Sequence, residues 1–346
     1  MATSVNNSAW LEWITGLMGG KSRQTCASAF PPDRFYCLLD ELPVHLVPRR
    51  AFRQAERWRN ESLYLNPECE VRAAEDVPHE FALSKDLLSG LALQGMIAWV
   101  RDSTMGALRP FWLGDEYIAI LSNLHPDEPV PLSVAPRIRS TLASAGIVIP
   151  KGQTGSGVSV LDGTIRQAGM QFRERGYTPL SNLIHPFHVA ALRRYYRRLI
   201  RTGAISLGDR QSARRYVAHN EPVARFFHRQ ILGALTAVAG EPLKPSYVYL
   251  ASYLSGAELK KHTDREQCEF SVTFCLDFSP EPPLATPWPI QLDTPTGRVT
   301  VHQALGDGLA YRGTRLPHYR APLAEGHTST SIFFHYVSSD FAGDLT

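Results

Sequence analysis

The sequence predicts an α+β protein, in which helices precede a C-terminal part built from short antiparallel strands. Two observations support this. After residue 245, segments rich in aromatic and β-branched residues alternate with turn residues, which is typical of strands. Before that point, apolar residues recur mostly at helical spacing. A chain of 346 residues also exceeds one comfortable core, so we expect two domains.

The composition is that of a soluble globular protein, with 44% apolar and 20% charged residues. The sequence has no long uncharged apolar run and no signal-peptide pattern at its start, so we expect no membrane span. The five cysteines show no Cys-x-x-Cys spacing, which argues against a disulfide framework or a zinc knuckle. We therefore expect a cytoplasmic protein.

A glycine-rich segment marks the expected domain boundary. It reads Lys151-Gly-Gln-Thr-Gly-Ser-Gly157 and contains no apolar side chain. We expect an N-terminal domain over residues 1–150, a linker over 151–157 and a second domain over 158–346.

The N-terminal domain is expected to be helix-rich at its start, over 30–62, and then to form a compact module. The module contains two strands, two helices and a terminal extended piece, at 96–100, 109–113, 115–124, 136–145 and 147–149. This pattern resembles the winged-helix peptide-recognition domains attached to enzymes that tailor ribosomally made peptides. The resemblance implies docking of a peptide or carrier-bound amino acid on an open strand edge; a purely structural helper domain is the alternative.

The second domain begins with helices, one over 186–202 and another that starts with Asn220 as N-cap and Pro222 in its first turn. The expected strands are 246–254, 268–278, 288–293, 298–301, 308–312 and 330–337. Six short strands after flanking helices are the layout of a double-stranded β-helix, a jelly-roll variant.

The net charge of +3 is unevenly distributed. Residues 1–150 hold 14 of the 36 basic and 17 of the 33 acidic side chains, so the rest of the chain is net positive. The positive balance of the second part fits a site for anionic small molecules. The acidic balance of residues 1–150 opposes a winged-helix nucleic-acid binder, since phosphate binding needs a basic face. An arginine cluster in the helix 186–202 is expected to form its solvated face. Its members are Arg193, Arg194, Arg197, Arg198 and Arg201.

The residues that carry chemistry lie around a His-x-Asp triplet. The string Tyr253-Leu-Ser-Gly256 leads to His262-Thr-Asp264, and a further histidine, His318, follows another expected strand. Two imidazoles and one carboxylate on one face of an octahedron are the donors that iron(II) oxygenases use, with the opposite face open for co-substrate and O₂.

This set resembles the prolyl-hydroxylase-like branch of the iron(II)- and 2-oxoglutarate-dependent oxygenases, over residues 185–340. The shared pattern is Tyr-x-x-Gly, His-x-Asp, and a distal histidine followed by a basic residue. The resemblance implies that His262, Asp264 and His318 bind Fe(II), and that 2-oxoglutarate and O₂ are co-substrates. It also implies hydroxylation of an unactivated C–H bond of a peptide, amino acid or natural product, with release of succinate and CO₂.

The 2-oxoglutarate site departs from that pattern. The family places Arg or Lys about ten residues after the distal histidine, where this chain has Thr328. Arg320 is the nearest permanent cation and would face the same side of a strand as His318, so we expect it to bind the far carboxylate, with Thr328 or Ser331 adding a hydroxyl bond. A structural ion pair is the alternative for Arg320. Tyr249 and Tyr253 either add a phenolic bond or fill the barrel.

Several alternatives remain open at this point. His335 is expected to be a buried structural histidine. Cys268 and Cys275 are expected on opposite faces of one strand, where they cannot share a metal. Asp264 leaves no ligand position for a halide, so hydroxylation is favoured over halogenation, while desaturation or cyclisation would use the same triad. A catalytically silent sensor or scaffold with this fold is the rival from another class.

Overall fold

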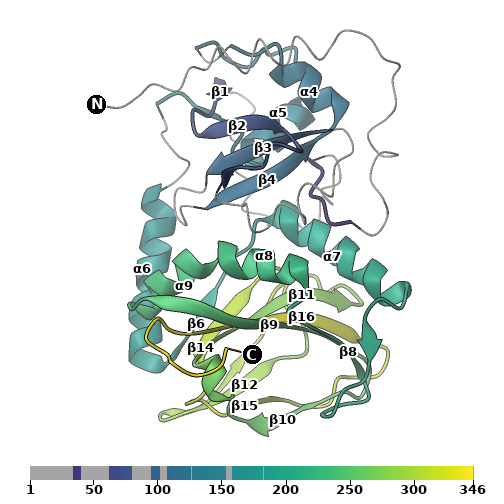
Figure 1. Cartoon of the computed structure of the whole chain (residues 1–346), viewed down its shortest axis with the longest axis vertical. Coiled ribbons are helices and arrows are strands. Elements are labelled where there is room, and N and C mark those ends of the chain that lie inside the picture. Colours follow the sequence, from purple (N-terminus) through teal and green to yellow (C-terminus); the bar gives the residue numbers. More distant parts are fainter. Residues whose placement is uncertain are drawn as a thin grey trace. The chain divides into compact units, whose positions relative to one another are not determined.

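The computed structural model describes residues 34–39, 62–79, 95–101, 107–125, 127–152, 158–181 and 183–345, without the side chains of 158–162 (Figure 1). The chain divides into two compact units, Met1–Gly157 and Val158–Thr346. Residues 153–157 of the expected linker and most of the expected helical opening at 30–62 lie outside the described residues.

A three-stranded antiparallel sheet is the centre of the first unit. Its order is β2 (Cys69–Ala73), β3 (Met96–Arg101) and β4 (Leu108–Leu113). The strands expected at 96–100 and 109–113 are thus confirmed. The expectation of an open edge is wrong for β3, because β3 pairs on both sides. On the far side of β4, the N–H of Trp112 donates to the carbonyl of Cys37 over 2.9 Å.

Two helices follow this sheet, α4 (Asp115–Leu121) and α5 (Pro136–Ser144), where the sequence predicts them. The expected extended piece is β5 (Val148–Pro150), and it pairs with β1 (Leu63–Leu65). The winged-helix resemblance is not confirmed, since a third strand precedes the two expected ones and β5 forms its own two-stranded sheet. Within the described ranges, the first unit has five strands and two helices, so it is not helix-rich there.

The second unit is built on two antiparallel sheets (Figure 1). The larger sheet has seven strands in the order β6 (Tyr177–Leu180), β14 (Gly308–Arg312), β11 (Phe270–Ser279), β16 (Thr328–Ser338), β9 (Leu243–Tyr253), β8 (Arg215–His219) and β7 (Ser206–Leu207). The smaller sheet has the order β10 (Leu259–His262), β15 (His318–Arg320), β12 (Ile290–Thr294) and β13 (Gly297–Val301). Two such sheets confirm the jelly-roll architecture that the sequence predicts.

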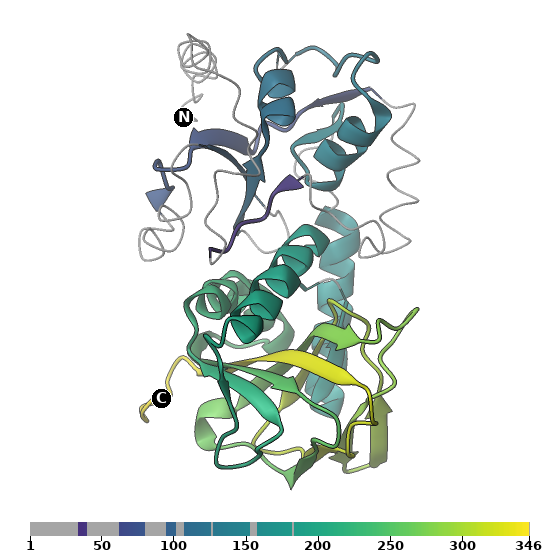
Figure 2. The ribbon, with the colours of Figure 1, turned by 90° about the vertical axis from the view of Figure 1, so that its right-hand side faces the viewer.

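Helices cover the outer face of the larger sheet, as Figures 1 and 2 show. They are α6 (Val158–Arg175), α7 (Pro186–Arg201), α8 (Pro222–Gln230) and α9 (Leu232–Ala239). The expected N-cap of α8 is wrong by one residue. Asn220 has a left-handed φ of 51°, and the Glu221 side chain accepts a hydrogen bond from the N–H of Ala224 instead.

The expectation that the α7 arginines form a solvated face is wrong for Arg193, whereas Arg197 is exposed as expected. Arg193 is only 4% exposed; its Nε donates to Asp277 Oδ1 over 2.9 Å, and its Nη2 lies 2.7 Å from Glu281. The Nε of Arg197 also donates to Asp277. These pairs connect α7 to β11 and its following loop.

The core of the second unit lies between its two sheets. One cluster packs Tyr253, Trp288 and Phe333 together, and another packs Leu292 against Tyr311. No helix within the described ranges is long and apolar enough to cross a membrane.

Candidate metal centre

Strand pairing places two histidines side by side. In the smaller sheet, His262 at the end of β10 is the direct antiparallel partner of His318 at the start of β15, and their ring centroids lie 4.4 Å apart. Asp264 follows two residues after β10, where its N–H donates to the carbonyl of Gly313 over 2.9 Å. The three residues singled out from the sequence therefore come together.

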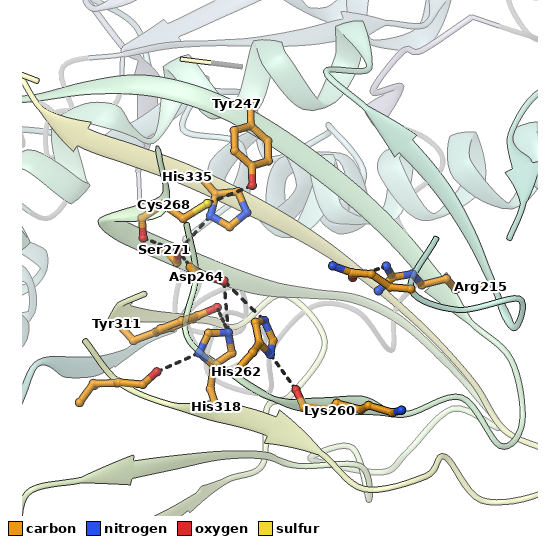
Figure 3. Close-up of polar contacts among 12 residues, drawn as sticks. Arg215, Tyr247, Lys260, His262, Asp264, Cys268, Ser271, Tyr311, His318 and His335 are labelled. Atoms are coloured by element: carbon orange, nitrogen blue, oxygen red, sulfur yellow. Dashed lines mark hydrogen bonds and ion pairs between the residues drawn. The ribbon is translucent and has the colours of Figure 1, made fainter. Parts of the chain in front are cut away.

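Both imidazoles are held in the orientation that a metal ligand needs (Figure 3). Nδ1 of His262 lies 2.7 Å from the carbonyl of Lys260, and Nδ1 of His318 lies 3.0 Å from that of Leu316. A carbonyl only accepts, so each Nδ1 carries the proton and each Nε2 keeps a lone pair in the neutral ring. The two Nε2 atoms lie 3.6 and 3.5 Å from Oδ1 of Asp264, so all three donor atoms converge on one position that can hold a metal.

Asp264 is ionised, and a hydrogen bond to its second carboxylate oxygen holds the side chain in place. Although burial alone raises the pKa of Asp264, the neighbouring rings of His262 and His318 outweigh burial and hold this pKa well below its usual value. The Ser271 hydroxyl donates to Oδ2 over 2.8 Å, and the same hydroxyl lies 2.9 Å from Nδ1 of His335. Burial lowers the pKa of His335 to about 4, so the neutral ring donates to Ser271, as expected of a structural histidine.

Gly313 provides the space that Asp264 occupies. A Cβ at Gly313 would overlap Oδ2 of Asp264 and the carbonyl of Cys268, and it would lie 2.6 Å from Oγ of Ser271. Only glycine fits here. Neither Gly313 nor Ser271 was predicted from the sequence, because no local pattern marks residues that support a ligand from another strand.

A second group of possible ligands is Asp264, Cys268 and His335. The Ser271 hydroxyl joins the side chains of Asp264 and His335 and also contacts the backbone carbonyl of Cys268, so it acts as a hydrogen-bonded support there. The expected placement of Cys268 in one strand with Cys275 is wrong: Cys268 ends a 3₁₀ turn before β11. Burial raises the pKa of the Cys268 thiol to about 12, so the thiol stays protonated, 3.0 Å from the Tyr247 hydroxyl.

Arg320 lies deep between the sheets, on the same strand as His318. It is 5% exposed, and burial lowers its pKa. Nη1 donates to the carbonyl of Trp288 over 2.6 Å, and Nη2 donates to Oε1 of Gln303 over 3.1 Å. Both partners are uncharged, and no carboxylate among the described residues pairs with Arg320, so the alternative of a structural ion pair is not supported. A buried cation without a counter-ion is costly, and an anionic ligand would offset that cost.

Neutral groups line the inner face of the larger sheet near Arg320. Oγ1 of Thr273 is buried without a hydrogen-bond partner among the described residues, and Nε2 of Gln303 donates to the Thr273 carbonyl over 2.9 Å. Ser331 pairs with Cys275, which lies within electrostatic range of Arg320. Thr328 is three residues from Ser331 in the same strand, so it faces the other side and does not meet Arg320.

The two expected tyrosines have different roles. Tyr253 is 1% exposed and packs edge-on against Trp288 with ring centroids 5.1 Å apart, so it fills the barrel. Tyr249 donates its phenol to Oδ2 of Asp209 over 2.6 Å. Asp209 in turn pairs with Arg215, and the Tyr249 hydroxyl is therefore already satisfied.

Among known proteins, only solved structures are similar to this chain. No protein-family model matches the chain, and no curated protein matches it. The solved structures that match include the epimerase SnoN in complex with Fe³⁺, α-ketoglutarate and nogalamycin RO (13% identity, 51% of this chain and 85% of that chain, TM-score 0.43). They also include the non-heme α-ketoglutarate-dependent carbocyclase SnoK from nogalamycin biosynthesis (14% identity, 50% of this chain and 84% of that chain, TM-score 0.42). A third is a Pseudomonas putida prolyl-4-hydroxylase (16% identity, 49% of this chain and 98% of that chain, TM-score 0.40).

These solved structures are similar to about half of this chain. At such identities and TM-scores, what this chain binds and does has to follow from its own residues.

Proposed function

We propose that residues 158–346 form an iron(II)- and 2-oxoglutarate-dependent oxygenase that hydroxylates an unactivated C–H bond. The observation that carries this proposal is the convergence of two Nε2 atoms and one carboxylate oxygen on a single position, with both Nδ1 atoms engaged by backbone carbonyls. Two neutral imidazoles and one carboxylate suit iron(II) and leave further coordination positions for small ligands.

The residues around Arg320 fit 2-oxoglutarate. A dicarboxylate that reaches from the metal position toward Arg320 would supply the counter-ion that the described residues do not provide, and the Thr273 hydroxyl, which has no hydrogen-bond partner among them, would donate to it. The planar guanidinium can bind a carboxylate in a bidentate manner, and burial strengthens that contact. Ser331 is the second hydroxyl on this face, whereas Thr328 is not part of the proposed site.

The protein's contribution is to bind, orient and exclude water. Iron(II), 2-oxoglutarate and O₂ together supply the oxidising power, and succinate and CO₂ are released. His318 is 2% exposed and Asp264 11%, so the inner side of the site is dry, while the His262 side chain is 38% exposed. The substrate therefore has its approach on the His262 side. The Ser271 bond holds Asp264 still while ligands exchange.

The decisive test is turnover of 2-oxoglutarate. Iron-loaded protein should convert 2-oxoglutarate to succinate, and a true substrate should raise the rate and gain one oxygen in mass. Replacing His262, Asp264 or His318 with Ala should abolish turnover, whereas His125→Ala, at an exposed histidine of the first unit, should not. Full turnover in His318→Ala would refute the assignment. Folded protein that binds neither iron nor 2-oxoglutarate would favour the rival sensor or scaffold.

We further propose that the first unit docks a peptide or carrier-bound substrate. The open edge belongs to β2, which pairs only with β3 among the described residues, and not to β3 or β4 as the sequence suggested. An edge strand can take up an extended peptide as a further strand. Protein lacking residues 1–157 should then keep basal 2-oxoglutarate turnover but capture substrate far more weakly. Unchanged substrate affinity would show that the unit has no docking role.

A further inference from the structure

We infer that the substrate carries a carboxylate on a flat, unsaturated body, and that Arg265 binds this carboxylate at the rim of the metal centre. This inference rests on the proposed oxygenase function and adds the substrate's chemical class to it. The residues that carry it form a continuous row along β8 and β9 and the segment that follows β10, which we call the rim wall. Its members are Arg265, Tyr247, His219, Tyr249 and Arg215.

The rim wall is continuous because neighbouring rings and cations stack on one another. The Arg265 guanidinium lies 5.2 Å from the centroid of the Tyr247 ring. Tyr247 stacks nearly parallel on His219, at 4.8 Å and 16°, and His219 meets Tyr249 at 5.9 Å. Arg215 closes the row, 5.6 Å from the Tyr249 centroid.

Strand geometry places this row on the metal side of the larger sheet. His219 pairs with Tyr249, and Arg215 pairs with Tyr253, whose ring packs between the two sheets. Alternate residues of a strand face the same side, so Tyr247 joins Tyr249 and Tyr253 on that inner face. His219 is exposed at the end of β8, so the row reaches solvent there.

The two arginines of the rim wall differ in charge balance. Arg215 is 3% exposed, and its Nε donates to Asp209 over 3.0 Å, so its charge is neutralised. Arg265 is exposed and forms no ion pair with a carboxylate among the described residues; its guanidinium lies over the Tyr247 ring, 5.2 Å from the centroid. Asp264 is within electrostatic range, but its oxygens face the histidines and Ser271.

Arg265 is therefore an exposed cation that lies against the Tyr247 ring without a matching anion among the described residues, next in sequence to a proposed metal ligand. A carboxylate suits its planar fork. The molecule attached to that carboxylate would extend over His219, whose pKa is lowered by burial and by Arg265, so that the ring is uncharged. A flat body stacks on such rings and on Tyr249.

The test uses phenylacetate as probe, with phenylacetamide and phenyl phosphate as matched comparisons. Ligand-observed NMR would give affinities for metal-free protein and for Mn(II)-loaded protein saturated with 2-oxoglutarate. We expect phenylacetate to bind at least tenfold more tightly than phenylacetamide, without displacing 2-oxoglutarate, and with line broadening by Mn(II). Arg265→Gln should lose that tenfold, whereas Arg175→Gln, at an exposed arginine of α6, should behave as the unaltered protein.

Equal binding of acid and amide, or an unaffected Arg265→Gln variant, would overturn the inference. Tighter binding of phenyl phosphate than of phenylacetate would overturn the assignment of a carboxylate. Failure of the proposed function would appear differently, as absent binding of Mn(II) and 2-oxoglutarate, while the Arg265 dependence in metal-free protein would still decide the inference.

Discussion

The hydroxyl of Ser271 donates to Oδ2 of Asp264 over 2.8 Å, and thus engages the carboxylate oxygen that does not face His262 and His318. This bond leaves only Oδ1 directed at the metal position. Removing a residue that hydrogen-bonds to a metal ligand typically changes the metal affinity 10–100-fold.

We therefore expect Ser271→Ala to weaken Fe(II) or Co(II) binding by about tenfold or more, since second-layer partners have effects of that size. Titration of the metal against a competing chelator would measure it. Ser271→Thr keeps the hydroxyl and should restore most of the affinity. An affinity in Ser271→Ala equal to that of the unaltered protein would show that the bond does not support the ligand.

Arg320→Ala should weaken 2-oxoglutarate binding and leave metal affinity nearly intact. The loss of a bidentate, charge-assisted contact in a buried site costs on the order of 2–3 kcal/mol, which is a tens-fold or greater rise in KM for 2-oxoglutarate. Arg315→Ala, at an exposed arginine of the same segment, is the matched control. An unchanged KM in Arg320→Ala would assign the far carboxylate to another residue.

Thr273→Val should have opposite effects on stability and on binding. Oγ1 of Thr273 is buried and has no hydrogen-bond partner in the part of the chain that the structure describes, so replacing it by a methyl group should raise the free energy of unfolding of the ligand-free protein by about 1 kcal/mol. The same change removes a donor from the proposed 2-oxoglutarate site and should weaken co-substrate binding. Denaturant unfolding and calorimetry would measure the two effects. If both stability and affinity fell, Thr273 would have a purely structural role.

Gly313→Ala should disrupt the metal site more than the fold. The added methyl group would overlap the Asp264 carboxylate and push it away from the two histidines. We expect loss of metal binding with near-native circular dichroism. Gly297→Ala is a useful control, since nothing lies within 4 Å of a Cβ there, although its φ of 124° makes that change strained too. Metal binding that survives Gly313→Ala would mean that Asp264 is not a ligand.

His228 should make the protein less stable in mild acid. Burial lowers its pKa from 6.5 to about 3, and its Nε2 donates to the carbonyl of His335 over 2.8 Å. Because its pKa is depressed in the folded state, the unfolded chain takes up the proton first. The stability from this group is present above pH 6.5 and falls by about 1.4 kcal/mol per unit as the pH drops toward 3.

The variant His228→Gln keeps a donor at this position but removes the titration. Urea unfolding at pH 7, 6 and 5 should therefore show a shallower loss of stability than in the unaltered protein. His125→Gln, at an exposed histidine, should leave the slope as it was. Identical slopes for His228→Gln and the unaltered protein would contradict a neutral, buried His228.

The sequence predicted the long strands well, because β9, β11 and β16 carry many aromatic and β-branched residues. It missed β10, whose Leu259-Lys-Lys-His262 has no strand-like composition, and the three-residue β15. Those two strands exist because they pair with each other. The same reason explains the site: His262, Asp264 and His318 stand in a recognisable motif, whereas Ser271 matters through a neighbour across the sheet, which local sequence does not reveal.

The register that sets His262 opposite His318 also has a consequence for how the protein acquires its metal. Before β10 and β15 pair, an ion would meet only His262 and Asp264, a pair of donors too weak to retain it. The third donor lies far along the chain, so tight binding begins only when this distant pairing closes the smaller sheet. A refolding chain would therefore bind the metal late in folding. The bound ion would then slow the unfolding of the barrel.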